Sequence, residues 1–130
     1  MTFPITTAYV LPLVLIWAVL WISVVKARGP LNCSIGDGGN PQLLLKIRRH
    51  GNFIEWVPLT LILMILAEAQ GTGAMWLHLA GGLLLIGRLA HPFGLKIENV
   101  NHPLRYVGNG PNFLAIAVLV IVLARIATGL

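Results

Sequence analysis

The stretch RRHGNFIEWVP, from Arg48 to Pro58, joins several charged and polar side chains to the start of an apolar run. It is followed by LTLILMILA (residues 59–67), and no further charged residue appears before Glu68. Charges at the mouth of a membrane-spanning helix are common, whereas an ionisable residue inside its apolar part is rare. Glu55 takes this second position. The stretch therefore predicts a membrane helix that carries a polar site near one end.

The composition of the whole chain also favours a membrane protein. Of its 130 residues, 57% are hydrophobic and only 10% are charged, against about 25% charged in a typical soluble domain. The net charge of +5 does not indicate nucleic-acid binding, because the basic residues lie between apolar spans rather than on one polar face. Cys33 is the only cysteine, which excludes an internal disulfide and a paired-cysteine metal site, and no metal is expected.

Four apolar runs have the extent needed to cross a bilayer as helices. A membrane helix needs about 20 apolar residues, and lipid offers its backbone no hydrogen-bonding partner. The runs are Ile5–Val25, Phe53–Ala67 (extended toward the N-terminus through residues 43–47), Ala74–Ile86, and Phe113–Ala124, which continues to Leu130. The sequence therefore predicts an all-α fold, an integral membrane bundle of four transmembrane helices that forms a single domain over residues 1–130.

The basic residues predict how these helices are oriented. Cytoplasmic loops of membrane proteins carry an excess of Lys and Arg. Five basic residues lie in or beside the first link and three in or beside the third, which leaves one of the nine elsewhere: Lys26, Arg28, Lys46, Arg48 and Arg49, then Arg88, Lys96 and Arg105. Both links are therefore expected in the cytoplasm, with both termini on the other side. Cys33 then lies in a reducing compartment, where a free thiol is expected.

The second helix is predicted to be longer than the bilayer core is thick. Asn40 suits the capping position and Pro41 the first helical position, and Gly71 marks the end. From Pro41 to Gln70 the helix would span about 45 Å at 1.5 Å per residue, whereas the hydrocarbon core is about 30 Å thick. Its N-terminal part must project from the membrane, which places the polar stretch at the cytoplasmic boundary and Glu55 just inside the core.

Arg48, Asn52 and Glu55 share one face of this helix, because they stand at positions i, i+4 and i+7. They cover about 10 Å of the helix axis. A cation, an amide and an anion in one line form a polar wall, and ionisable groups at this depth face a protein interior or a wet cavity. A salt bridge from Glu55 to Arg48, or to an arginine of another helix, would satisfy the charges without a ligand. The spacing alone thus leaves a binding site and a structural ion pair open.

The same residues resemble a known family. The string GDGGNPQLLLKIRRHGNFIEWVPL (Gly36–Leu59) is similar to the signature region of the membrane-associated proteins in eicosanoid and glutathione metabolism, the MAPEG family, and most similar to its bacterial branch. The motif here reads Arg48-x3-Asn52-x2-Glu55-Trp56-x-Pro58. A second similar region, GRLAHPFGL (Gly87–Leu95), ends the third span. The number of spans, the chain length and the expected orientation agree with this resemblance.

The resemblance implies a homotrimer in the bacterial inner membrane that binds glutathione, as its thiol substrate, between subunits near the cytosolic face. Residues that correspond to Arg48, Asn52 and Glu55 contact the tripeptide in the family. Further implied glutathione ligands, at the end of the first span and on the third, are Lys26, Arg28, Arg88 and His91. Arg105 resembles the family's catalytic arginine, whose charge favours the nucleophilic thiolate over the thiol. For each of these basic residues, an interfacial anchor that fixes the topology is the alternative.

The implied function is glutathione transfer to hydrophobic electrophiles dissolved in the membrane lipid, with reduction of lipid hydroperoxides as a related reaction. This chain departs from well-studied members at Trp56, where they have a tyrosine, and at His91 and Leu95, where tyrosines approach the thiol. An indole donates a hydrogen bond but neither accepts one nor acts as a phenol acid. The alternative is a non-catalytic membrane protein, whose polar stripe stabilises the trimer or binds a lipid headgroup.

Overall fold

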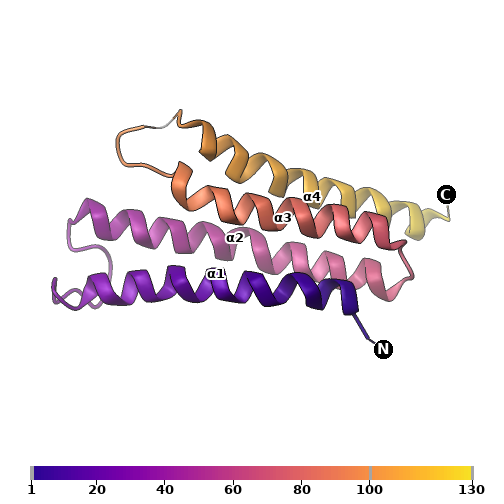
Figure 1. Ribbon diagram of the computed structural model, residues 1–130, viewed down its shortest axis with the longest axis horizontal. Helices are drawn as coiled ribbons and strands as arrows, with labels where there is room; N and C mark the ends of the chain where they lie inside the picture. The colour runs from indigo at the N-terminus through magenta and orange to yellow at the C-terminus, as the bar shows by residue number, and fades with distance from the viewer. Residues whose placement is uncertain (1, 100, 130) are drawn as a thin grey trace.

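The computed structural model describes residues 2–99 and 101–129, which form four helices: α1 (Pro4–Arg28), α2 (Pro41–Ala69), α3 (Ala74–Gly94) and α4 (Pro103–Thr128). The helices lie along one common direction, with the α1–α2 and α3–α4 links at one end and both termini at the other (Figure 1). All four are long and apolar enough to cross a membrane. The predicted all-α arrangement of four membrane-spanning helices is confirmed.

The start of α2 follows the capping signal that the sequence contains. The Asn40 side chain accepts hydrogen bonds of 3.0 Å from the backbone N–H groups of Gln42 and Leu43, and Pro41 occupies the first turn. The helix ends at Ala69, one residue before the predicted end, and Gly71 then takes a positive φ of 77°. A left-handed backbone of this kind favours glycine. At 29 residues, α2 is about 43 Å long and exceeds the bilayer core.

Two helices extend further than the apolar runs predicted. α3 continues past Ile86 to Gly94, and α4 begins at Pro103 rather than near Phe113. Both extensions pass through an internal proline without ending. The apolar runs were shorter than the helices because residues 87–94 of α3 and 103–112 of α4 include charged and polar side chains. A search for uncharged stretches stops at such side chains. The observed end at Gly94 lies one residue before Leu95, where the family resemblance ends the third span, and Arg88 and His91 lie on α3 as that resemblance implied.

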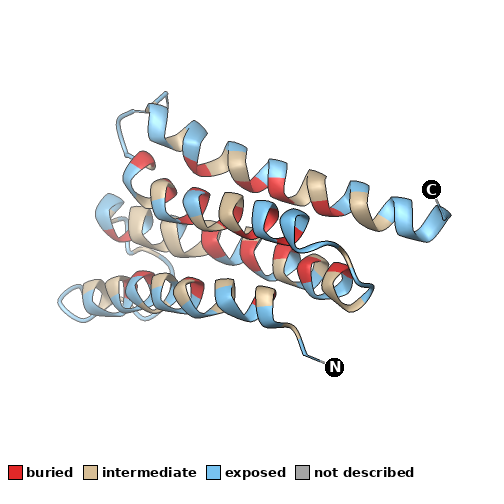
Figure 2. Cartoon of the chain, turned by 45° about the vertical axis from the view of Figure 1, so that its right-hand side comes forward, coloured by how far each residue is buried: buried red, intermediate tan, exposed pale blue. Residues whose placement is uncertain are grey.

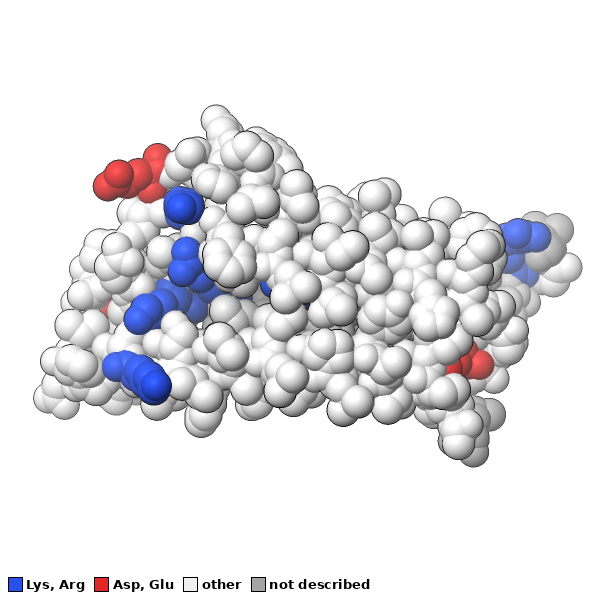
Figure 3. Space-filling model, in the orientation of Figure 1, with Lys and Arg blue, Asp and Glu red and all other residues white. Residues whose placement is uncertain are grey.

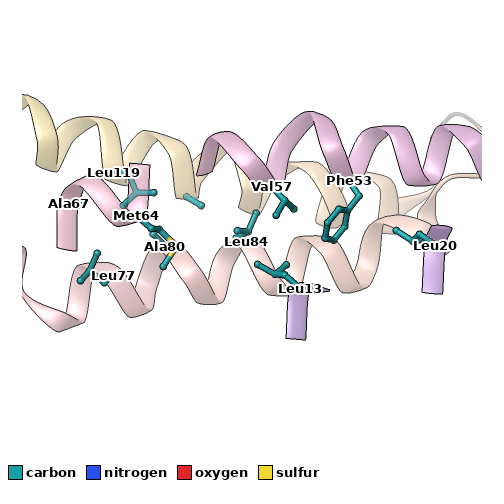
Figure 4. Close-up of a cluster of buried hydrophobic side chains, with 11 residues drawn as sticks. Leu13, Leu20, Phe53, Val57, Met64, Ala67, Leu77, Ala80, Leu84 and Leu119 are labelled. Carbon is teal, nitrogen blue, oxygen red and sulfur yellow. The ribbon is translucent and has the colours of Figure 1, made fainter. Parts of the chain in front are cut away.

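The apolar core lies between α2 and α3, each of which contacts all three other helices, whereas α1 and α4 do not contact each other. Phe53 and Val57 of α2 project toward Leu84 of α3, and Leu13 of α1 joins them from the side (Figure 4). The outward faces of α1 and α4 are mostly exposed (Figure 2), and they present large apolar side chains such as Leu15, Val19 and Ile121. Lipid covers such faces in a membrane protein.

Glycines allow α3 to pack closely on its neighbours. A Cβ added at Gly81 would overlap the Tyr9 ring of α1, and one added at Gly87 would lie 2.6 Å from the Asn112 side chain of α4. These distances are too short for real carbon contacts, so both positions need glycine. Small residues commonly serve close helix packing in membranes, and here they serve it within the subunit.

The charged side chains are distributed unevenly along the bundle. In the view of Figure 3, most visible Lys and Arg atoms gather at the end where the α1–α2 and α3–α4 links lie. The middle of the molecule is almost free of visible charge on this face. The two links that the sequence marks as basic therefore share one end of the bundle, as four spans in alternating directions require.

Candidate functional site

The polar stripe, Arg48, Asn52 and Glu55, lies on one face of α2, as its spacing predicted. Arg48 Nη2 lies 3.3 Å from Glu55 Oε1 and forms an ion pair with it. Asn52 Nδ2 donates a longer hydrogen bond of 3.5 Å to Glu55 Oε2. The side chains of Arg48 and Glu55 remain 57% and 52% exposed. The ion pair that the sequence left open is thus present, but it buries neither charge.

The depth of Glu55 makes this exposure costly in a single subunit. Glu55 lies fourteen positions before the end of α2 at Ala69, which corresponds to about 21 Å of helix. This is less than the ~30 Å thickness of the hydrocarbon core, so Glu55 lies inside the core when that end reaches the opposite surface. Charges at membrane depth face protein or water rather than lipid. The stripe therefore needs a polar or protein covering.

Arg88 of α3 is the one charged side chain in the buried core of the described residues, at 1% exposure. Its Nη1 donates to Asn52 Oδ1 at 2.7 Å and to the Asn52 carbonyl at 3.2 Å, and its Nη2 donates to the Gly108 carbonyl at 2.7 Å. The Asn112 side chain donates to the same carbonyl. Arg88 thus joins α2, α3 and α4 at one level and supports the stripe from inside the subunit.

The charge of Arg88 is held mainly by neutral oxygen atoms. Within the part of the chain that the structure describes, no carboxylate lies within ion-pair distance of its guanidinium, although Glu55 acts on it electrostatically from further away. Its Nε is buried and has no partner among those residues. A guanidinium stays protonated in proteins, so this region of the subunit has an excess of positive charge next to the stripe.

His91 lies one turn after Arg88 and is buried, at 3% exposure. It packs against α4 so closely that a Cβ at Gly108 would lie 2.6 Å from the His91 Cα. The positive charges of Arg88, Arg105 and Arg49 all act on its imidazole. His91 is therefore buried against α4, and the charges of three guanidinium groups act on it.

Arg105 lies in the first turn of α4 and is half-buried. Together with Tyr106, Asn109 and Gly110 it lines a surface recess of about 420 Å³. The Asn109 Oδ1 atom is buried and lacks a hydrogen-bond partner among the described residues. The residues of the stripe do not line this recess. Within one subunit, the structure thus places Arg105 beside a recess of α4 that is separate from the stripe.

The two basic residues at the end of α1 differ in their surroundings. Arg28 Nη1 donates to the carbonyls of Cys33, at 3.1 Å, and Gly36, at 2.9 Å, so its charge stabilises the α1–α2 link. Lys26 is exposed in the last turn of α1. No contact joins either residue to the stripe within the described chain.

Two residues that support the site were not among the predicted site residues. Arg49 Nη2 donates to the Leu95 carbonyl at 2.9 Å and ties α2 to the end of α3. Asn112, fully buried, stands opposite Gly87 and shares the Gly108 carbonyl with Arg88. The sequence does contain a signal for Asn112, because it is a polar residue directly before a fully apolar run.

Comparisons with known proteins agree with these features. The sequence model of the MAPEG family matches residues 6–125. The chain is 36% identical over 104 residues to the inner membrane protein YecN of Escherichia coli K12, which covers 79% of this chain and 76% of that protein, and the YecN protein of Escherichia coli O6:H1 matches equally. No solved structure matches the chain. Since the family match extends over all four helices, including the stripe and Arg88, the chain belongs to the MAPEG family.

Proposed function

We propose that this protein is a glutathione transferase of the bacterial inner membrane, which joins glutathione to hydrophobic electrophiles. The observation that carries the proposal is the exposed stripe of Arg48, Asn52 and Glu55 at membrane depth, supported from behind by the buried Arg88. The family is linked to glutathione metabolism, and the Escherichia coli relatives are inner membrane proteins by name.

The chemical groups of the stripe match those of glutathione. The tripeptide has two carboxylates, one ammonium group and one thiol. Arg48 can pair with a carboxylate through two parallel hydrogen bonds, and Glu55 can accept the ammonium group. The 3.3 Å ion pair between them would be exchanged for two ligand pairs, so neither charge is left unmatched. Arg88 occupies Asn52 Oδ1, whereas Asn52 Nδ2 donates one long hydrogen bond to Glu55 and has a second N–H for the ligand.

A homotrimer would give the stripe its covering. The exposed ion pair lies at a depth where lipid is an unfavourable neighbour, and a second copy of the subunit provides a protein surface there. Lys26 is exposed at the cytoplasmic end of α1 and can add a cation to a site shared between subunits. Arg28 already donates hydrogen bonds to two carbonyls of the α1–α2 link, so we assign it a structural role in preference to a glutathione contact.

Arg105 is proposed to favour the thiolate form of glutathione. A free thiol has a pKa of about 8.5, and a neighbouring cation lowers this value. Arg105 stays charged, and its place in the first turn of α4 adds the positive end of the helix dipole. The thiolate sulfur then bonds to the electrophilic carbon, the leaving group departs with its electron pair, and the thiol proton has passed to water. Hydrophobic electrophiles reach this site by partition into the bilayer.

A non-catalytic membrane protein is the second candidate, and one observation favours it. Arg48 pairs with Glu55, and Arg88 is hydrogen-bonded to Asn52 and Gly108, without any ligand. In that case the stripe holds the subunits together or binds a lipid headgroup, and glutathione has no site.

The two candidates differ in how the purified protein responds to glutathione. A transferase gives the ultraviolet absorbance of a bound thiolate, is stabilised thermally by glutathione, and turns over a chlorodinitrobenzene-type electrophile. S-methylglutathione is the matched control, since it should stabilise the protein without giving a thiolate signal. Light scattering, with the detergent mass subtracted, tests the trimer in the same sample. An intact trimer that shows neither stabilisation nor thiolate absorbance would overturn the transferase proposal.

A further inference from the structure

A second site lies at the opposite end of the bundle, where the α2–α3 link meets α4. A groove of about 380 Å³ is formed there by the turn around Thr72, by Trp76 of α3, and by one side of α4 from Val118 to Ile126. It shares no lining residue with the stripe or with the recess at Arg105. Nothing in the proposed transferase reaction uses it.

The groove changes from polar to apolar along its length. Arg125 lies in the last turn of α4, whereas Val118 lies seven residues earlier, about 10 Å further from the end of the helix. Between them, Ile121 and Val122 give the groove an apolar wall. A groove that begins at a cation near the helix end and continues along apolar side chains has the polarity of a lipid molecule.

Three features at the polar end favour a negatively charged group. The Arg125 guanidinium has no carboxylate partner among the residues that the structure describes. Thr72 Oγ1 is buried and has no hydrogen-bond partner there either. α3 begins after Gly73, which provides no side-chain cap, and the first turn of a helix favours an anion.

No acidic side chain competes for this position. The lining of the groove contains no Asp or Glu. Glu68, the acidic residue closest in sequence to the α2–α3 link, is engaged elsewhere. Its carboxylate accepts hydrogen bonds from the Ile5 and Thr6 backbone N–H groups, both at 2.9 Å, and from Thr6 Oγ1 at 2.6 Å. Glu68 thereby caps α1, and among the described residues no acidic side chain pairs with Arg125.

Trp76 indicates that the groove opens at the membrane surface. It is 42% exposed and lies in the first turn of α3, and tryptophan is enriched at the boundary between lipid and water. All four helices of the bundle are long and apolar enough to span the bilayer, so the first turn of α3 lies near one membrane surface. In Figure 1 the C-terminal end of α4 extends beyond the start of α3. The polar end of the groove thus lies at headgroup level.

We propose that this groove binds an anionic phospholipid, with the phosphate at Arg125 and the first turn of α3, and an acyl chain along α4 toward Val118. Inorganic phosphate would leave the apolar wall uncovered. A zwitterionic phospholipid would bring an ammonium group for which the lining provides no carboxylate. The predicted orientation assigns the lipid to the outer leaflet, but the proposal holds for either orientation and is independent of the transferase function.

The test compares lipid binding to the delipidated full-length protein in mild detergent by native mass spectrometry. Phosphatidylglycerol should bind about fivefold more tightly than phosphatidylcholine, the effect of one cation near a charged headgroup. Arg125→Gln should abolish this preference, and Arg125→Lys should retain most of it. Lys96→Gln, which removes an exposed positive charge from the other end of the bundle, is the matched control and should keep the full preference.

A second measurement locates the lipid. Phosphatidylglycerol brominated in its acyl chains should quench the fluorescence of the wild type more than that of Trp76→Phe. Equal affinity for the two lipids, or an unchanged preference in Arg125→Gln, would overturn the proposal. Absence of bound lipid would also overturn it and would indicate that another part of the assembly covers the groove. Displacement of the lipid by glycerol phosphate would show an anion site rather than a phospholipid site.

Discussion

Arg88 Nη1 lies 2.7 Å from Asn52 Oδ1, and this hydrogen bond joins the buried interior of the bundle to the exposed stripe on α2. Arg88 itself is 1% exposed, so it reaches the stripe only through Asn52. Asn52 in turn stands between Arg48 and Glu55 on the same helical face. The position of the central amide of the stripe therefore depends on a guanidinium that is buried inside the subunit.

Arg88→Ala is expected to reduce both stability and glutathione binding. It leaves Asn52 Oδ1 without its Arg88 donor and leaves the Gly108 carbonyl with Asn112 as its side-chain donor, and hydrogen bonds to charged groups contribute about 1.5–3 kcal/mol each. Thermal unfolding in detergent, with and without glutathione, should show a lower midpoint and a smaller ligand shift. Arg88→Lys should recover only part of each, because one ammonium group replaces a planar fork. An unchanged midpoint in Arg88→Ala would show that these contacts contribute nothing.

Gly108→Ala should disrupt the packing of α3 on α4. The added Cβ would lie 2.6 Å from the His91 Cα, and a backbone atom cannot move aside as a flexible side chain can. Overpacking of this kind costs about 1–3 kcal/mol, which thermal unfolding detects. Gly110→Ala is the matched control on the same helix, since nothing lies within 4 Å of its added Cβ. It should be neutral or slightly stabilising. Equal stability of the two variants would argue against close α3–α4 packing.

Glu55→Gln tests the proposed contact with the glutathione ammonium group. The change keeps the shape of the side chain and removes its charge. Since a charged hydrogen bond contributes about 1.5–3 kcal/mol, the affinity for glutathione should fall about tenfold or more, as measured by calorimetry. The proposed trimer should survive. Glu98→Gln, at an exposed position of the α3–α4 link, should leave the affinity unchanged. Loss of the trimer in Glu55→Gln, in a protein that glutathione never stabilised, would favour the structural candidate.

The orientation of the bundle predicts where Cys33 lies. The basic residues assign the α1–α2 link to the cytoplasm, so a membrane-impermeant maleimide should not label Cys33 in intact cells and should label it after permeabilisation. A Thr128→Cys variant in a Cys33→Ser background should behave in the opposite way, because Thr128 is exposed at the other end of the bundle. Labelling of Cys33 before permeabilisation would reverse the topology and place the stripe at the wrong membrane surface.

Much of the fold could be predicted because the relevant signals are local. The cap at Asn40, the length of α2 and the face shared by Arg48 and Glu55 depend only on residues near one another in sequence. The apolar runs alone did not reach the end of α3 or the start of α4. A helix continues wherever its backbone is satisfied, whereas the apolar run stops at the first polar side chain, so Arg88 fell outside the third apolar run although the family resemblance assigned it to the third span.

The interior of the site could not be predicted, because it depends on contacts between helices. Arg88, His91 and Arg105 had the same appearance in the sequence, that of polar residues near the membrane boundary. Only the tertiary structure distinguishes a guanidinium hydrogen-bonded inside the subunit from one beside a surface recess. The role of Asn112 could not be predicted for the same reason. Its side chain fits against α3 only because Gly87 has no Cβ there, and it donates a hydrogen bond to the Gly108 carbonyl that Arg88 of α3 also contacts.

The chemistry proposed for Arg105 predicts a pH-dependent defect. Arg105→Ala removes a cation that lowers the thiol pKa of bound glutathione, so that pKa should return toward about 8.5. At neutral pH the variant should lose most conjugation of a chlorodinitrobenzene-type electrophile, and at alkaline pH, where the thiol ionises unaided, it should recover in part. Glutathione affinity should change only a few-fold, and Arg105→Lys should keep some activity because a point charge suffices for this role. Turnover measured across pH, in parallel with calorimetry, separates a binding defect from a chemical one. Unchanged turnover in Arg105→Ala would show that Arg105 does not stabilise the thiolate. Lys26 would then be the next cation to replace.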